Sequence, residues 1–221
     1  MATISGTVIT KSTGIGAGDI AIANTINSGG SMTVYDGGSA NSTTIDYRGG
    51  MLISSGGSAN STTINTAGRM IVSGGSANST INSGGRMTVY NGSANNTTID
   101  YRGSMIVNVS GSANNTTINY GGSMTVYDGS ANSTTVNTSG NMTVYGYASA
   151  NNTTVNSGGS MYAGGTANNT TVNSGGSMHA GGTANNTTVN SGGSMTVSWG
   201  TANNTTVYSG GSMTVSRGTA N

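Results

Sequence analysis

One repeat of 17 to 19 residues runs through most of this 221-residue chain, and it restricts the fold more than any other feature. Apart from Met1, every methionine falls at the same position of the repeat. These methionines are Met32, Met51, Met70, Met87, Met105, Met124, Met142, Met161, Met178, Met195 and Met213. Self-similarity at a fixed period indicates a protein built by stacking one small structural unit.

Two further apolar columns accompany the methionines. An Ile or Val lies six residues before each Met, and an Ala precedes that residue by five positions, except that Ala77 is only four residues before Ile81. The Ile/Val column comprises Ile26, Ile45, Ile64, Ile81, Ile99, Ile118, Val136, Val155, Val172, Val189 and Val207. The distance from Met to the next Ala varies from six to eight residues, so the length changes fall in one corner loop of an otherwise fixed coil.

The repeat contains two short runs in which apolar and polar residues alternate. Met124-Thr125-Val126 places Met and Val on one face, and Thr154-Val155-Asn156 points Val inward and its neighbours outward. Alternation bounded by glycine pairs predicts β-strands and turns. Glycine every few residues, at roughly 1 kcal/mol each, together with many Thr, Val and Asn residues, disfavours a helix.

Such short strands cannot bury a face alone, but stacked copies cover one another. We therefore predict an all-β fold: a single-stranded parallel β-solenoid of about 11 coils of 17–19 residues, in which the methionines form a core ladder. At about 4.8 Å per coil, the rod would be roughly 50 Å long.

The two ends depart from the repeat. Residues 1–31 keep several isoleucines but not the pattern, which predicts an N-terminal cap or lead-in segment before solenoid repeats over 32–221. The last coil stops in mid-repeat, so the repeats are expected to be uncapped at the C-terminus. Because open strand edges pair with other chains, end-to-end stacking into a fibre is an alternative function.

An asparagine follows every alanine of the repeat: Asn41, Asn60, Asn78, Asn95, Asn114, Asn132, Asn151, Asn168, Asn185, Asn203 and Asn221. Asparagine tolerates left-handed backbone geometry, and stacked amides can bond along an axis. We interpret this column as a structural ladder, with ligand binding as the alternative.

Composition excludes several functions. The net charge is +1 with only 5% charged residues, so nucleic-acid binding lacks an electrostatic basis. No apolar run reaches the roughly 20 residues of a membrane span, and no membrane insertion is expected. Absent cysteine excludes thiolate metal sites, and no cofactor or metal is expected. The first residues lack the features of an export signal.

Units such as Ser191–Val197 followed by Gly200–Val207 resemble the AIDA-type repeat of bacterial autotransporter adhesin passenger domains. The resemblance implies a right-handed β-helix at the bacterial cell surface or outside the cell. It further implies self-association, lateral or end to end, or contact with a host surface or glycan. In some members a dedicated heptosyltransferase glycosylates Ser and Thr. The repeat of that family carries no catalytic residues.

Catalysis is not expected from the residues either. The chain has one histidine, His179, and no glutamate. Asp46 and Asp100 occupy equivalent positions three coils apart, about 14 Å, which is too far for the paired carboxylates of a glycosidase. We expect no enzyme.

Outward Thr and Asn side chains form the candidate functional surface. Its members are Thr63, Asn65, Thr117, Asn119, Thr135, Asn137, Thr154, Asn156, Thr171, Asn173, Thr188 and Asn190. We predict a rigid rod that presents Ser, Thr and Asn ladders for self-association, host contact or Ser/Thr glycosylation. Such a flat array also resembles the face of ice-binding solenoids, which is a less favoured alternative. A tyrosine stripe (Tyr35, Tyr90, Tyr127, Tyr145) lies three residues after Met in some coils.

Overall fold

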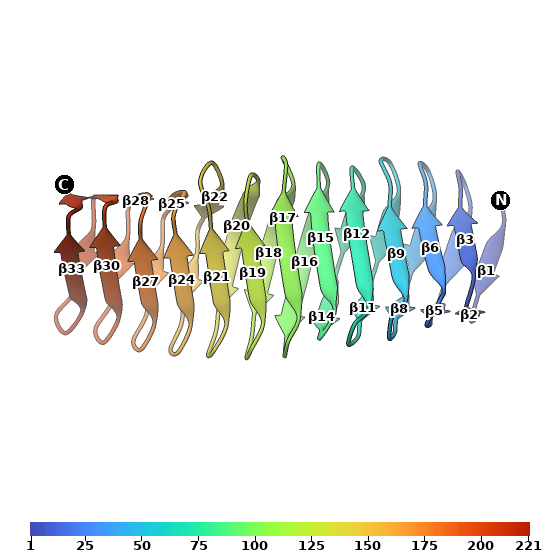
Figure 1. The fold of residues 1–221 in the computed structure, drawn as a ribbon, viewed down its shortest axis with the longest axis horizontal. Coiled ribbons are helices and arrows are strands. Elements are labelled where there is room, and N and C mark those ends of the chain that lie inside the picture. The colour runs from blue at the N-terminus through green and yellow to red at the C-terminus, as the bar shows by residue number, and fades with distance from the viewer.

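The structure is a computed structural model that describes all residues 1–221, and it consists of strands, turns and bends with no helix. The coils stack along one axis, with the N-terminus at one end and the C-terminus at the other (Figure 1). All strand pairs are parallel, and they form one sheet of 12 strands and one of 22. The predicted all-β parallel β-solenoid is confirmed, with about 12 coils.

The 12-stranded sheet carries the methionines and is here called the Met sheet. Its strands are β3 (Ser12–Ile15), β6 (Ser31–Val34), β9 (Gly50–Ile53), β12 (Arg69–Ser73), β15 (Arg86–Tyr90), β17 (Ser104–Asn108), β19 (Ser123–Val126), β21 (Asn141–Val144), β24 (Ser160–Ala163), β27 (Ser177–Ala180), β30 (Ser194–Ser198) and β33 (Ser212–Ser216).

The 22-stranded sheet carries the asparagines and is here called the Asn sheet. Its first column holds β1 (Thr3–Ser5), β4 (Ile20–Ile22), β7 (Ser39–Asn41), β10 (Ser58–Asn60), β13 (Ser76–Asn78), β16 (Ser93–Asp100), β18 (Ser112–Ile118), β20 (Ser130–Val136), β22 (Ser149–Asn151), β25 (Thr166–Asn168), β28 (Thr183–Asn185), β31 (Thr201–Asn203) and β34 (Thr219–Ala220). The second column holds β2 (Val8–Ile9), β5 (Thr25–Ile26), β8 (Thr44–Ile45), β11 (Thr63–Ile64), β14 (Ile81–Ser83), β23 (Thr154–Val155), β26 (Thr171–Val172), β29 (Thr188–Val189) and β32 (Thr206–Val207). In β16, β18 and β20 the two columns merge into one longer strand.

The core lies between the two sheets and is built from like residues in register. Met70 pairs with Met51 on one side and Met87 on the other, and the alanine column stacks in the same way. The methionines from Met32 to Met195 are at most 3% exposed, and Met213 in the last coil is partly buried. Stacking therefore buries a continuous core that no single coil could form.

The chain bends within the Asn sheet at a residue with left-handed backbone geometry. This residue comes directly after the ladder asparagine: Ser42 has φ 55° and Asn152 has φ 56°. The ladder asparagine itself lies in an extended strand, so the left-handed geometry expected there belongs to its successor. Serine and asparagine are among the residues that turns favour.

Glycine pairs close the turn between the Asn sheet and the Met sheet. In the pair Gly158-Gly159, the first residue has φ 70°, and a Cβ on the second would lie 2.5 Å from the Val136 carbonyl oxygen of the previous coil. The close approach of consecutive coils thus excludes a side chain at this corner.

The N-terminal segment 1–31 is folded in the same register as the repeats. β1 pairs with β4, β2 with β5 and β3 with β6. The segment expected as a cap or lead-in is therefore built as solenoid coil, which accounts for the coil beyond the eleven counted from the methionines.

Ile81 does not belong to the inward Ile/Val column, and this sequence-based assignment was wrong. It pairs with Thr63 and Thr98 of the outward column and is 48% exposed. Asn82 takes the inward place, where its Nδ2 donates to the Ser104 carbonyl (2.8 Å) and its Oδ1 accepts from the Gly85 amide (3.1 Å). The coil is one residue shorter here, and a shift of one residue moves side chains to the opposite face of a strand.

Candidate functional surface

The asparagines that follow alanine form an unbroken hydrogen-bonded column along the Asn sheet, here called the Asn ladder. Each Nδ2 donates to the Oδ1 of the asparagine in the preceding coil, from Asn60 to Asn41 (2.9 Å) through to Asn221 to Asn203 (2.9 Å). The bonds between Asn114, Asn132 and Asn151 in the middle have the same length, 2.9 Å. The amides are thus engaged with one another, as a structural ladder requires.

The outward Thr and Asn positions of the candidate surface lie beside this ladder and are half-buried. Asn119 donates to Asp100 (2.8 Å), and Asn137 donates to Asn119 (2.9 Å). The same column continues through Asn156, Asn173 and Asn190. A separate, shorter part of the column lies nearer the N-terminus, where Asn65 donates to Asp46. Between the two parts the short coil with the inward Asn82 breaks the column.

A column of buried threonines was not recognised from the sequence. In each Thr-Thr-Ile or Thr-Thr-Val run the second Thr is outward, but the hydroxyl of the first is buried. Nine of these hydroxyls, and that of Thr80 in the shorter run Ser79-Thr80-Ile81, have no hydrogen-bond partner: Thr43, Thr62, Thr80, Thr97, Thr116, Thr134, Thr153, Thr170, Thr187 and Thr205. The alternation of inward and outward side chains begins again after the residue with left-handed backbone geometry. This restart was the sequence signal that could have identified the buried threonines.

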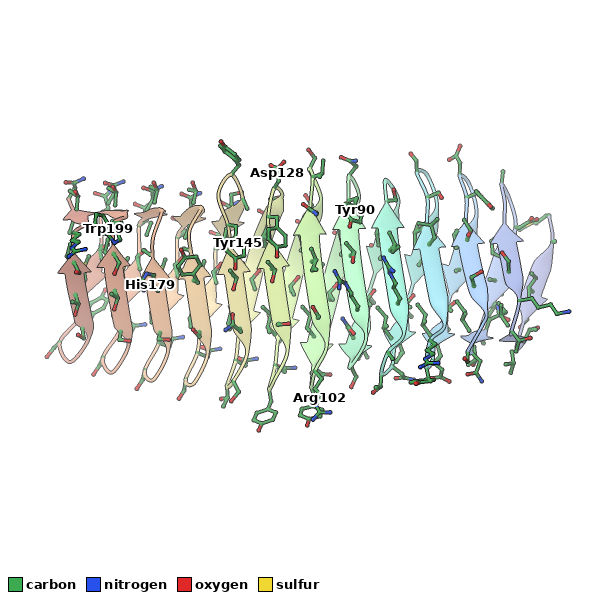
Figure 2. The ribbon with its side chains drawn as sticks, viewed as in Figure 1. Tyr90, Arg102, Asp128, Tyr145, His179 and Trp199 are labelled. Carbon is green, nitrogen blue, oxygen red and sulfur yellow. The ribbon has the colours of Figure 1, made fainter.

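The outer face of the Met sheet is more varied. Tyr127 stacks on Tyr145 (centroids 5.1 Å apart), Tyr145 meets Tyr162 at 6.2 Å, and Tyr162 stacks on His179 at 5.4 Å. Figure 2 shows Tyr145 and His179 on this face. The tyrosine stripe of the sequence is therefore extended by two residues from a different repeat position, and His179 is a member of an aromatic row.

Charged groups on the turns pair with aromatic rings. The Arg48 guanidinium lies 4.9 Å from the Tyr47 ring centroid, and Arg102 lies 5.0 Å from that of Tyr101. No group of three or more His, Cys, Asp or Glu side chains is placed to hold a metal ion. The structure contains no helix with the length and apolar character needed to cross a membrane.

A family model described as "Adhesin of bacterial autotransporter system, probable stalk" (AIDA) matches residues 17–68, 79–140 and 122–176, more than half of the chain. The chain belongs to the AIDA adhesin family. The resemblance of its repeats to that family is thereby confirmed. A search among curated proteins finds no match.

A solved structure shares this AIDA fold over the full chain. It is described as the crystal structure of a TibC-catalysed, hyper-glycosylated TibA fragment, residues 55 to 350. The two are 38% identical, the alignment covers 100% of both chains, and the TM-score is 0.76. The likeness therefore extends over the whole solenoid.

Proposed function

We propose that this chain is an adhesin-type repeat region of a bacterial cell-surface or extracellular protein, and that a glycosyltransferase modifies its exposed serines. Membership of the AIDA adhesin family supports the first part. The TibA fragment, which carries TibC-catalysed glycosylation on the same fold, supports the second. The proposal assigns the chain a structural and adhesive role without catalysis.

The observation that carries the proposal is the exposure of serines at one turn of successive coils. Ser157, Ser174 and Ser191 are exposed. Each serine lies beside a glycine of the next coil that has left-handed backbone geometry, namely Gly175, Gly192 and Gly210. A Cβ built on that glycine would lie 2.6 Å from the serine hydroxyl oxygen. Because glycine stands there, no side chain covers the hydroxyl. These serines are accessible acceptors, whereas the buried threonine column cannot be reached.

The rigid stack suits such modification because every acceptor repeats at the coil spacing. Sugars on Ser157, Ser174 and Ser191 would stand about 4.8 Å apart per coil along one edge. The Asn sheet next to this edge offers half-buried Thr and Asn columns for lateral contact between two rods. We infer that self-association and host contact use these polar faces.

Incubation of the purified chain with a TibC-type heptosyltransferase and nucleotide-activated heptose tests the modification. Intact mass spectrometry should show several heptose additions, and peptide mapping should place them on exposed serines. Combined replacement of Ser157, Ser174 and Ser191 by Ala should remove the corresponding additions. Thr153→Val, at a buried hydroxyl, is the matched control and should leave the number unchanged. An unmodified mass would contradict the glycosylation part of the proposal.

A further inference from the structure

Two arginines stand side by side on the outer face of the Met sheet. Arg69 and Arg86 are direct partners in the parallel register of β12 and β15, so their backbones lie about 4.8 Å apart. Both side chains are exposed, and neither takes part in an ion pair. Only 6 of the 221 residues are Lys or Arg, so this pairing is specific to the site. Like charges placed directly opposite each other destabilise a sheet.

The chain itself does not supply the missing negative charge. None of the five carboxylates lies on a strand of the Met sheet. Asp46 and Asp100 are bonded to asparagines on the Asn sheet. Asp36 and Asp128 lie on turns beyond the far ends of Met-sheet strands, roughly 16 Å along the strand from the arginine position. Figure 2 shows Asp128 at that edge of the solenoid.

A hollow of about 260 Å³ is lined by Arg69, and Arg86 stands on the next coil beyond it. It exists because Gly50 occupies the position that Arg69 and Arg86 hold in the following two coils. The backbone does not require this glycine, since a Cβ there would meet no atom within 4 Å. The floor is apolar, formed by the partly exposed Leu52 and Ile71.

Hydroxyl groups complete the hollow on the side opposite Arg69. Ser31 and Thr33 line it from β6, and both are half-buried. The hollow thus combines the positive charge of Arg69, an apolar floor and two hydroxyl groups, and Arg86 adds a second positive charge one coil beyond it. A carboxylate matches the forked guanidinium geometry, an apolar floor suits the C–H face of a sugar ring, and hydroxyls bond to sugar hydroxyls.

We propose that this hollow is a binding site for a saccharide that carries a carboxylate group. Arg69 and Arg86 bind the carboxylate, and Leu52 and Ile71 contact the ring. The site lies on a different face from the Asn sheet and does not use the exposed turn serines. It is therefore independent of the proposed glycosylation, and the unmodified chain suffices to test it.

Titration calorimetry of the full chain with sialyllactose, lactose and inorganic phosphate tests the proposal. Sialyllactose should bind at least about tenfold more tightly than either of the other probes, because only it offers both the charge and the ring. Equal affinity for lactose would overturn the role of the arginines. Equal affinity for phosphate would overturn the saccharide assignment.

Variants locate the binding. The double variant Arg69→Gln/Arg86→Gln should lose sialyllactose binding, and Gly50→Gln should lose it by filling the hollow without backbone strain. Arg48→Gln, which removes an arginine that stacks on Tyr47 at a turn, is the control and should bind as the unchanged chain does. Circular dichroism verifies that each variant is folded. Retained binding in the double arginine variant would refute the site.

Discussion

Replacing Thr116 by valine tests whether the buried threonine column opposes folding. Thr116 is 1% exposed, and its hydroxyl oxygen has no hydrogen-bond partner. A buried polar group without a partner costs about 1–3 kcal/mol, and replacing it by an apolar group of the same shape removes that cost. The added methyl contributes up to about 0.8 kcal/mol of burial.

We therefore expect Thr116→Val to raise the free energy of unfolding by about 1–3 kcal/mol. In a chain of this size each kcal/mol corresponds to about 2–4 °C in Tm. Guanidinium unfolding followed by circular dichroism measures the change. Hydrogen exchange of the amides in β18 should be measured in addition, because stacked repeats need not unfold in a single step.

Thr117 provides the matched control, since it is the next residue and points outward, half-buried. Thr117→Val should change the stability by less than about 0.5 kcal/mol. A Thr116→Val protein that is less stable by 1 kcal/mol or more, with Thr117→Val unchanged, would refute the reasoning. The hydroxyl would then have a partner, such as an ordered water molecule.

Three further predictions concern the other columns, each measured by guanidinium unfolding. Met124→Ala should cost about 2–5 kcal/mol, because it leaves a cavity in the core; a smaller loss would mean that neighbouring coils collapse into the space. Asn132→Ala breaks two ladder bonds and should cost about 1–3 kcal/mol, whereas Asn41→Ala at the ladder end breaks one and should cost about half as much. Equal costs would contradict the ladder. Ile81→Thr should change stability by less than about 0.5 kcal/mol, while Ile99→Thr should be strongly destabilising. A large loss for Ile81→Thr would place that side chain in the core.

The periodic sequence predicts much of the fold. One methionine per coil at a constant distance from an Ile or Val identifies the stacking unit, and the stack needs no long-range pairing beyond the next coil. The in-register methionines and the amide ladder follow, because identical side chains at one repeat position must lie over one another when the coils have equal length.

The inward or outward direction of single residues was predicted less well. At Ile81 the constant distance to Met87 indicated an inward position, but the shortened distance from Ala77 shifts the strand by one residue, so Asn82 faces inward instead. Side chains alternate with a period of two, so one missing residue reverses the assignment. The sequence does not decide at which corner of the coil the residue is missing.

The sequence by itself determined the repeat, the parallel stacking and the identity of the core columns, because these depend only on spacing along the chain. The tertiary structure alone decided which neighbours meet across different repeat positions. It joined Tyr145 to Tyr162, buried the first threonine of each pair, and placed Leu52, Ile71 and Arg69 around the hollow at Gly50. These contacts depend on side-chain direction and on which coil lies next, and neither property is contained in a repeat pattern.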